Sequence, residues 1–261
     1  MFIMQMPNNP FTIRVLAKAS FLPFLLLTWC TTQISVARAA SGCDGAGNCY
    51  IYAASKGSGT GASWANAYNG FGTGSGKVNP AAMSRGVTYW IANGNYGGIN
   101  FSTPDSGTTV IAVKGATNAS HGPASDWSSS YAGQALFTGG GVTSDYWTFN
   151  GQTRGADWQS GYTIKFWNQS AAQGASMTLG TGSSGVGNIN FQYVEFEGTG
   201  AGFPNNNSTS DKCNSDNCGI WMDNAIYENQ PVSNLYVGYG YAHHTGNTQF
   251  QMNVTDRKSV V

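Results

Sequence analysis

The chain has 261 residues, of which only 9% are charged, and its formal net charge at pH 7 is zero. This balance, without a basic run, argues against nucleic acid as a partner. The 36 glycines suggest a low-complexity chain, but 13% of the residues are aromatic and recur at strand-like spacing, which disordered segments do not show. The composition therefore predicts one folded β domain or a single array of repeats.

The first 39 residues have the pattern of a secretory signal peptide. Basic residues precede a short apolar run, and small residues follow where signal peptidase would cut: Arg14 and Lys18, then Phe21–Trp29, then Ala37-Arg38-Ala39. The apolar run is shorter than the roughly 20 residues that a membrane-spanning helix needs. We therefore expect a secreted protein, extracellular or on the cell surface, with no membrane span in a mature chain that begins near residue 40.

Four cysteines remain after this cleavage: Cys43, Cys49, Cys213 and Cys218. In an exported protein two local disulfides, Cys43–Cys49 and Cys213–Cys218, are the expected arrangement, although four cysteines allow three connectivities. A zinc site is the alternative, but the spacings are loose and no histidine is nearby in sequence.

An ordered set of motifs spans residues 50–101. It contains Ser63-Trp64-Ala65-Asn66-Ala67, a short helix candidate at Pro80–Arg85 with Asn79 as N-cap, and two strands separated by an Asn-Gly turn within Gly86–Phe101. This order resembles the opening of secreted right-handed parallel β-helix proteins of the pectate-lyase-like superfamily. The resemblance implies that the small helix caps the first coil. Val87 departs from it, because many relatives carry Asp at that position.

Short alternating runs bounded by Gly, Asn, Ser or Asp follow this region. They are Thr109–Val113, Ala135–Thr138, Tyr146–Asn150, Tyr162–Trp167 and Ser176–Leu179. Many short strands are also typical of an antiparallel β-sandwich, which is the alternative fold.

An internal repeat favours the β-helix over the sandwich. Asn188–Gly200 aligns with Asn234–Gly246 at an offset of 46, and Asn188/Asn234, Tyr193/Tyr239, Thr199/Thr245 and Gly200/Gly246 are identical. Strands and Gly turns at such a period are typical of a β-solenoid, and asparagines at equivalent turns can stack between coils. We therefore expect an all-β, right-handed parallel β-helix with an N-terminal capping helix.

The repeat copies are separated by the polar segment Ala201–Cys218, which we interpret as an inserted loop. A strand predicted at Cys218–Asn224 is then expected to have a counterpart at Gln249–Asn253, with Ile220 aligned to Phe250 and Met222 to Met252.

The last six residues, DRKSVV, concentrate charge in a chain that has little. They match the translation of GAT-CGG-AAG-AGC-GTC-GTG, which resembles common sequencing-adapter DNA. Our hypothesis is that residues 256–261 are a non-native tail, and that the β-helix domain of residues 40–255 is truncated at its C-terminus.

Strand alternation predicts a functional face on the repeat. If Val194 and Phe196 point into the coil, Glu195 and Glu197 point outward. Coil stacking then places Glu195 beside Tyr241 and Glu197 beside His243. His244 is the weaker candidate because it falls at a turn. The same reasoning turns Lys165, Trp221 and Asp223 outward, the last two near Gln251 and Asn253.

Exposed carboxylates, an imidazole and aromatic rings are what a sugar-binding cleft contains. Carboxylates can act as general acid, general base or Ca²⁺ ligands. We therefore assign candidate catalytic roles to Glu195, Glu197, Asp223 and His243, and substrate-binding roles to Trp221, Tyr241 and Lys165. Ca²⁺ is a possible cofactor, also at Asp211 and Asp216, but no metal-ligand set is assigned. The alternative is an ordinary solvated β-face.

The predicted function is to bind or act on extracellular polysaccharide, as a polysaccharide lyase or glycoside hydrolase, in a chain expected to be monomeric. β-Helix lyases use Arg or Lys as the base, but no lyase motif matches around Lys165 or Arg154, so no family catalytic residue is transferred. A non-catalytic surface or adhesive β-helix is the rival function, because the fold hosts both classes.

Overall fold

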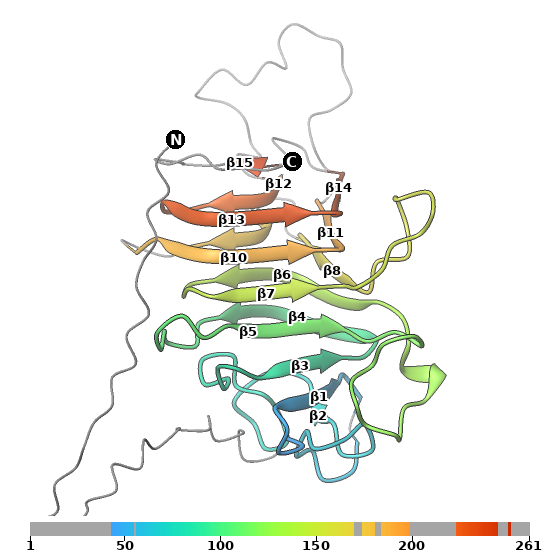
Figure 1. The fold of residues 1–261 in the computed structure, drawn as a ribbon. Helices are drawn as coiled ribbons and strands as arrows, with labels where there is room; N and C mark the ends of the chain where they lie inside the picture. Colours follow the sequence, from blue (N-terminus) through green and yellow to red (C-terminus); the bar gives the residue numbers. More distant parts are fainter. Residues whose placement is uncertain are drawn as a thin grey trace, which may run out of the picture. The chain divides into compact units, whose positions relative to one another are not determined.

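The computed structural model describes residues 43–54, 56–169, 174–180, 184–198, 223–244 and 250–251. These residues are all-β apart from one 3₁₀ turn at Ser129–Tyr131, labelled η1 (Figure 1). They contain no helix long and apolar enough to cross a membrane. The predicted signal peptide, Trp221, the cysteines Cys213 and Cys218, the acidic pair Asp211 and Asp216, and the tail 256–261 lie outside the described residues.

The first sheet has seven strands in the order β13-β10-β7-β5-β3-β1-β2, and every pairing in it is parallel. Its strands are β1 (Asn48–Tyr52), β2 (Tyr68–Asn69), β3 (Thr88–Ile91), β5 (Ile111–Gly115), β7 (Trp147–Asn150), β10 (Val186–Gln192) and β13 (Val232–Gly238).

The second sheet is also parallel and has the order β14-β11-β8-β6-β9-β12-β15, with β4 paired to β6. Its strands are β4 (Gly94–Phe101), β6 (Ala135–Val142), β8 (Ile164–Trp167), β9 (Gly174–Leu179), β11 (Val194–Glu197), β12 (Asp223–Glu228), β14 (Tyr241–His243) and β15 (Phe250–Gln251).

This second sheet divides into two arms at β6. The first half of β6 pairs with β8, through Phe137 and Phe166, whereas its second half pairs with β9, through Gly140 and Met177. Gly140 lies at the bend, where a Cβ atom would approach Met177 to 2.8 Å and Phe166 to 3.0 Å. From β7 onward the chain therefore gives one strand to the first sheet and then two to the second, one on each arm. Strands that recur in this way are consistent with a β-solenoid, and the parallel pairings rule out the antiparallel sandwich.

The internal repeat is confirmed by strand register. Ile189 pairs with Leu235 and Phe196 with Ala242, both at the predicted offset of 46. The Asn234 side-chain amide donates a hydrogen bond of 3.1 Å to Oδ1 of the Asn188 side chain, which is the predicted stacking of asparagines. Both have a positive φ, 56° for Asn188 and 51° for Asn234, a conformation that Asn tolerates better than most residues.

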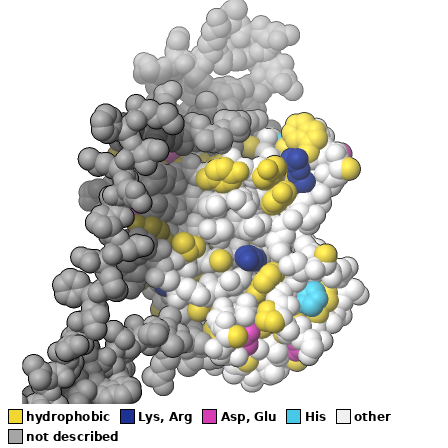
Figure 2. Space-filling view, in the orientation of Figure 1, with side chains coloured by type: hydrophobic (Ala, Val, Ile, Leu, Met, Phe, Trp, Pro, Cys, Tyr) yellow, Lys and Arg dark blue, Asp and Glu magenta, His cyan; other side chains and the backbone are white. Residues whose placement is uncertain are grey.

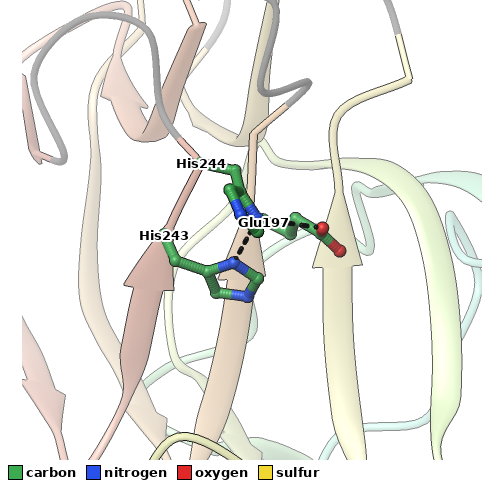
Figure 3. Close-up of side chains that lie close together, drawn as sticks. All are labelled: Glu197, His243 and His244. Carbon is green, nitrogen blue, oxygen red and sulfur yellow. Dashed lines mark hydrogen bonds and ion pairs between the residues drawn. The ribbon is translucent and has the colours of Figure 1, made fainter.

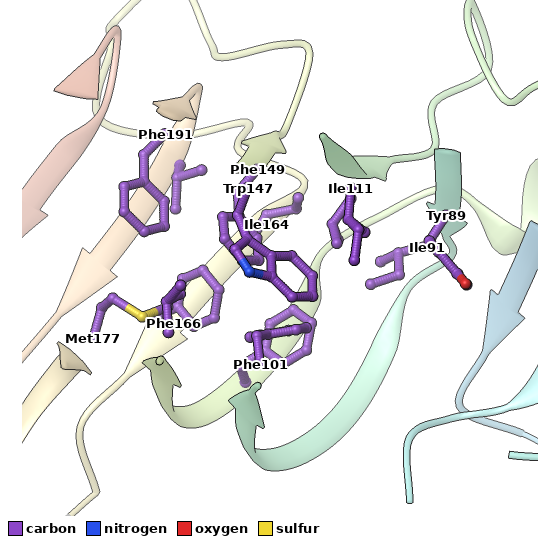
Figure 4. Packing of buried hydrophobic residues seen from close by; sticks show 14 of the residues in the cluster. Tyr89, Ile91, Phe101, Ile111, Trp147, Phe149, Ile164, Phe166, Met177 and Phe191 are labelled. Atoms are coloured by element: carbon purple, nitrogen blue, oxygen red, sulfur yellow. The ribbon is translucent and has the colours of Figure 1, made fainter. Parts of the chain in front are cut away.

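The interior is filled by buried aromatic side chains from neighbouring strands of the two sheets (Figure 4). Phe166 stacks on Phe137 at 4.9 Å and on Phe196 at 5.9 Å, while Phe149 stacks on Phe191 at 5.1 Å between ring centroids. Parallel strands about 4.8 Å apart place equivalent inward side chains in register, so aromatic residues at matching positions form continuous columns.

The predicted capping helix at Pro80–Arg85 is wrong. The Asn79 side chain accepts from Ala81 N at 3.0 Å, and Ala82 N donates to the Asn79 carbonyl, which closes a single turn. The next backbone N–H groups find partners elsewhere, because Met83 N donates to Thr103 Oγ1 and Ser84 N to the Tyr89 hydroxyl. These contacts replace the i to i−4 bonds that a helix requires.

A second aromatic cluster, built on Trp64, Tyr50 and Trp90, lies near the start of the described chain and is separate from the main core. The buried Trp64 ring contacts the rings of Tyr50 and Trp127 at 5.0 and 4.9 Å. His121 stacks on Trp127 at 4.7 Å. The predicted disulfide Cys43–Cys49 is confirmed. Cys49 lies on β1, next to Tyr50 of this cluster.

Asp126 secures the Trp64 segment and gives the fold a testable pH dependence. Its carboxylate accepts from Ala65 N at 2.7 Å and from Trp64 N at 3.2 Å. Burial opposes ionisation, but these bonds and one from Ser63 outweigh it, so the pKa of Asp126 lies below its ordinary value of 3.8. Because the pKa is lower in the folded state than in the unfolded state, ionised Asp126 stabilises the fold at any pH above about 3.8. This stabilisation is lost as the pH falls through the folded-state pKa.

We expect Asp126→Asn to lower the free energy of unfolding by about 1 kcal/mol at neutral pH, because a carboxylate that caps two N–H groups is replaced by a single acceptor. The difference from wild type should disappear well below pH 3.8. Urea unfolding at both pH values measures it, with Asp157→Asn in an exposed turn as the control. A difference that stays constant with pH would contradict this role.

Candidate functional site

The outward side chains of β8, β11 and β14 meet on one arm of the second sheet. Register sets Lys165 beside Glu195 and Glu195 beside Tyr241, while Glu197 lies beside His243. Successive residues of a strand point to opposite faces, so Lys165, Glu195 and Glu197 point away from the core. The residues that flank them on β8 and β11 are fully buried in it: Ile164, Phe166, Val194 and Phe196. The predicted juxtaposition is therefore confirmed, and Lys165 is part of it.

Lys165 bridges the two carboxylates. Its ammonium lies 2.9 Å from Glu195 Oε1 and also binds Glu197 Oε2. The second oxygen of Glu195 accepts from the Gln134 side-chain amide at 2.8 Å, a contact that strand alternation alone does not predict. Glu195 is consequently only 8% exposed, which corrects the expectation of an exposed carboxylate. Its neighbours on the adjacent strands cover it although it points away from the core.

The electrostatics hold Lys165 and Glu197 in their charged forms. Burial lowers the pKa of Lys165, but its hydrogen bonds and attraction to Glu197 and Glu195 dominate and raise it above the ordinary 10.5. Burial likewise raises the pKa of Glu197, but the Lys165 ammonium and the neighbouring histidines bring it below the ordinary 4.5. Both groups are therefore ionised at neutral pH.

Two histidines complete the polar cluster (Figure 3). His243 Nε2 lies 3.0 Å from Glu195 Oε1, and His243 Nδ1 lies 2.7 Å from His244 Nδ1. His244 Nδ1 is also 3.3 Å from Glu197 Oε1. Sequence reasoning ranked His244 below His243 because it falls at a turn, yet that turn brings it into the cluster.

Aromatic rings border the cluster on one side. The Tyr241 ring stacks on His243 at 4.4 Å and lies nearly parallel to Tyr162 at 6.3 Å, and Trp158 meets Tyr241 edge-on at 5.9 Å. Trp158 is 53% exposed. Tyr162 and Trp158 precede β8, and only the fold brings them to Tyr241 on β14. In the sequence, the occurrence of two aromatic residues in an otherwise polar segment was the signal that could have pointed to them.

Asp223, another predicted site residue, lies on a different arm of the sheet. It begins β12 and pairs there with Gly174. The alignment of Ile220 with Phe250 is wrong, because β15 pairs Phe250 with Ile226 and Gln251 with Tyr227.

The first-sheet face differs in character from this cluster. Figure 2 shows it dominated by uncharged polar and backbone atoms, with scattered hydrophobic side chains and few charged ones among the described residues. The group Lys165–Glu195–Glu197 is thus a concentration of charge in a chain that is 9% charged.

Comparisons with protein-family models, with curated proteins and with solved structures give no match for this chain.

Proposed function

We propose that the protein is a secreted right-handed parallel β-helix that binds extracellular polysaccharide on the outward face of β8, β11 and β14. The fold assignment is supported by two all-parallel sheets whose strands recur in the same order along the chain. Parallel strands joined by crossovers within a sheet are right-handed in nearly all proteins.

The observation that carries the proposal is the row of aromatic rings beside a charged hydrogen-bonding group. Trp158, which is 53% exposed, and the partly exposed Tyr241 offer ring surface to a sugar, while the buried ring of Tyr162 packs against Tyr241. Sites for small ligands combine such aromatic walls with a few placed polar groups. Lys165 and the carboxylates beside Tyr241 supply donors and acceptors for hydroxyl or uronate groups.

The ion pairs favour recognition over catalysis. A glycoside hydrolase needs two carboxylates that flank the scissile bond, and in this cluster one ammonium binds both Glu195 and Glu197. A lyase that used Lys165 as its base would need the neutral amine, whereas its raised pKa keeps it protonated.

A lyase or hydrolase at the same face is the second candidate function. The contact of 3.0 Å between His243 Nε2 and Glu195 Oε1 favours it, because a carboxylate that orients an imidazole is a common acid–base arrangement.

The test incubates the mature protein with a panel of uronate and neutral polysaccharides and measures retention and product release. We expect Trp158→Ala to weaken retention by about tenfold, which corresponds to the loss of one stacking ring. Tyr146→Ala is the matched control, because Tyr146 also has a positive φ, 61° against 52° for Trp158, but it precedes β7 in the other sheet.

Each outcome of this test separates the candidates. Retention without products supports binding, and it is the expected result. New unsaturated ends that absorb ultraviolet light identify a lyase, whereas new reducing ends without them identify a hydrolase. Failure of every polysaccharide to bind, or equal binding by wild type and Trp158→Ala, overturns the proposed face.

A further inference from the structure

We propose that Glu197, His243 and His244 form a binding site for a divalent transition-metal ion of the Zn²⁺ type. One ligand atom from each of these side chains lies within 4.8 Å of the other two. The measured separations are 2.7 Å between the two Nδ1 atoms and 3.3 Å from His244 Nδ1 to Glu197 Oε1. Ligand atoms around a tetrahedral zinc ion are roughly 3.3 Å apart, so small adjustments complete the geometry.

The number of protons available for hydrogen bonds among these three side chains supports a metal site. His244 Nδ1 faces two acceptors, His243 Nδ1 and Glu197 Oε1, but a neutral imidazole nitrogen can donate only one proton. A cation placed among the three atoms would accept a lone pair from each of them.

The surrounding residues already orient two of the ligands. His243 Nε2 donates to Glu195 Oε1 at 3.0 Å, which leaves the Nδ1 lone pair directed at the site. Glu195 is in turn fixed by Gln134 and Lys165, and the second oxygen of Glu197 binds Lys165. Metal-binding histidines almost always donate their other N–H group to a carboxylate, carbonyl or water in this way.

The backbone explains how two consecutive histidines converge. Successive residues of a strand point to opposite faces, so His244 would otherwise point away from His243. Its φ of 51° lies in the left-handed region and turns its ring back toward the same face (Figure 3). The His244 side chain is 64% exposed, so solvent reaches this edge of the site and can supply a fourth ligand.

The donor set selects the class of ion. Two imidazole nitrogens and one carboxylate oxygen suit Zn²⁺, Cu²⁺ or Ni²⁺, whereas Ca²⁺ takes six to eight oxygen ligands. This group of residues therefore favours a transition metal over the Ca²⁺ that its carboxylates alone suggested.

The test titrates the metal-free mature protein with Zn²⁺ in a calorimeter. We expect one ion per chain. Glu195→Gln, which removes an orienting carboxylate, should weaken binding by about 10–100-fold, and His244→Ala, which removes a direct ligand, by more than that. His121→Ala is the control, because His121 stacks on Trp127 in another part of the chain, and its affinity should equal that of wild type.

Electron paramagnetic resonance of the Cu²⁺-loaded protein gives an independent readout. Wild type should show coupling to two imidazole nitrogens and His244→Gln to one, with circular dichroism confirming that both chains are folded. The proposal is overturned if wild type does not bind Zn²⁺, if His244→Ala and His244→Gln bind as tightly as wild type, or if His121→Ala weakens binding equally. None of these results depends on whether polysaccharide binds.

Discussion

Phe166→Ala should lower the free energy of unfolding by about 3–5 kcal/mol, the range measured for large-to-small changes of buried aromatic residues. Phe166 is fully buried and lies between Phe137 and Phe196 in one aromatic column, at centroid distances of 4.9 and 5.9 Å. Its ring also meets Phe149 and Phe191 edge-on. Removal leaves a cavity that the structure cannot close, because the hydrogen bonds that pair β8 with β6 and β11 hold these strands at a fixed spacing.

Urea unfolding followed by tryptophan fluorescence measures this loss, and two further variants test its cause. Phe166→Leu retains part of the buried volume and should cost less than half as much. Val110→Ala alters an apolar side chain that is 40% exposed and should change stability by less than about 0.5 kcal/mol. If Phe166→Ala costs no more than Val110→Ala, packing between the aromatic rings does not stabilise the fold.

Lys165→Met is the second large effect, with an expected loss of about 2–3 kcal/mol. Removing one partner of a buried ion pair costs about 3–5 kcal/mol, and partial exposure reduces this. The side chains of Lys165, Glu195 and Glu197 are 16%, 10% and 22% exposed. Without the ammonium two adjacent carboxylates face each other with reduced access to water. The measurement is urea unfolding at neutral pH with a chelator present, so that no bound cation compensates.

The charge explanation is tested by repeating Lys165→Met in a chain that already carries Glu195→Gln and Glu197→Gln. There the cost should fall below about 1 kcal/mol, because no buried charge is left unpaired. Lys114→Met is the matched control: Lys114 also lies on a strand, β5, but its ammonium is over the Trp90 ring at 5.3 Å, a contact worth about 0.5–1 kcal/mol. An equal cost of Lys165→Met in both backgrounds would assign the effect to packing of the lysine stem.

Local patterns were sufficient for the strands and for the register of the repeat. The alternation of Val194, Glu195, Phe196 and Glu197 determines which side chains enter the core, since successive residues of a strand face opposite ways. The offset of 46 between the repeat copies then determined that Glu195 pairs with Tyr241. A slip of one residue would place charged side chains in the aromatic interior, so the sequence excludes it.

Two sequence predictions were wrong for the same reason: the helix at Pro80–Arg85 and the alignment of Ile220 with Phe250. Each depended on a short segment whose backbone partners lie far away in sequence. Met83 N donates to the Thr103 hydroxyl, and Phe250 pairs with Ile226 on the adjacent strand β12. Helix-start signals describe only local preference, and tertiary hydrogen bonds override them in a segment this short.

By itself, the sequence predicted an all-β chain of short strands with an internal repeat, which the parallel register confirms. It also predicted that Lys165, Glu195, Glu197, Tyr241 and His243 point away from the core. Only the tertiary structure decided how these outward residues interact. It covered Glu195 with Gln134, joined both carboxylates through Lys165 and turned His244 back onto His243. Periodicity determines which face a side chain is on, whereas the burial and partners of a charged group depend on strands and segments that are distant in sequence.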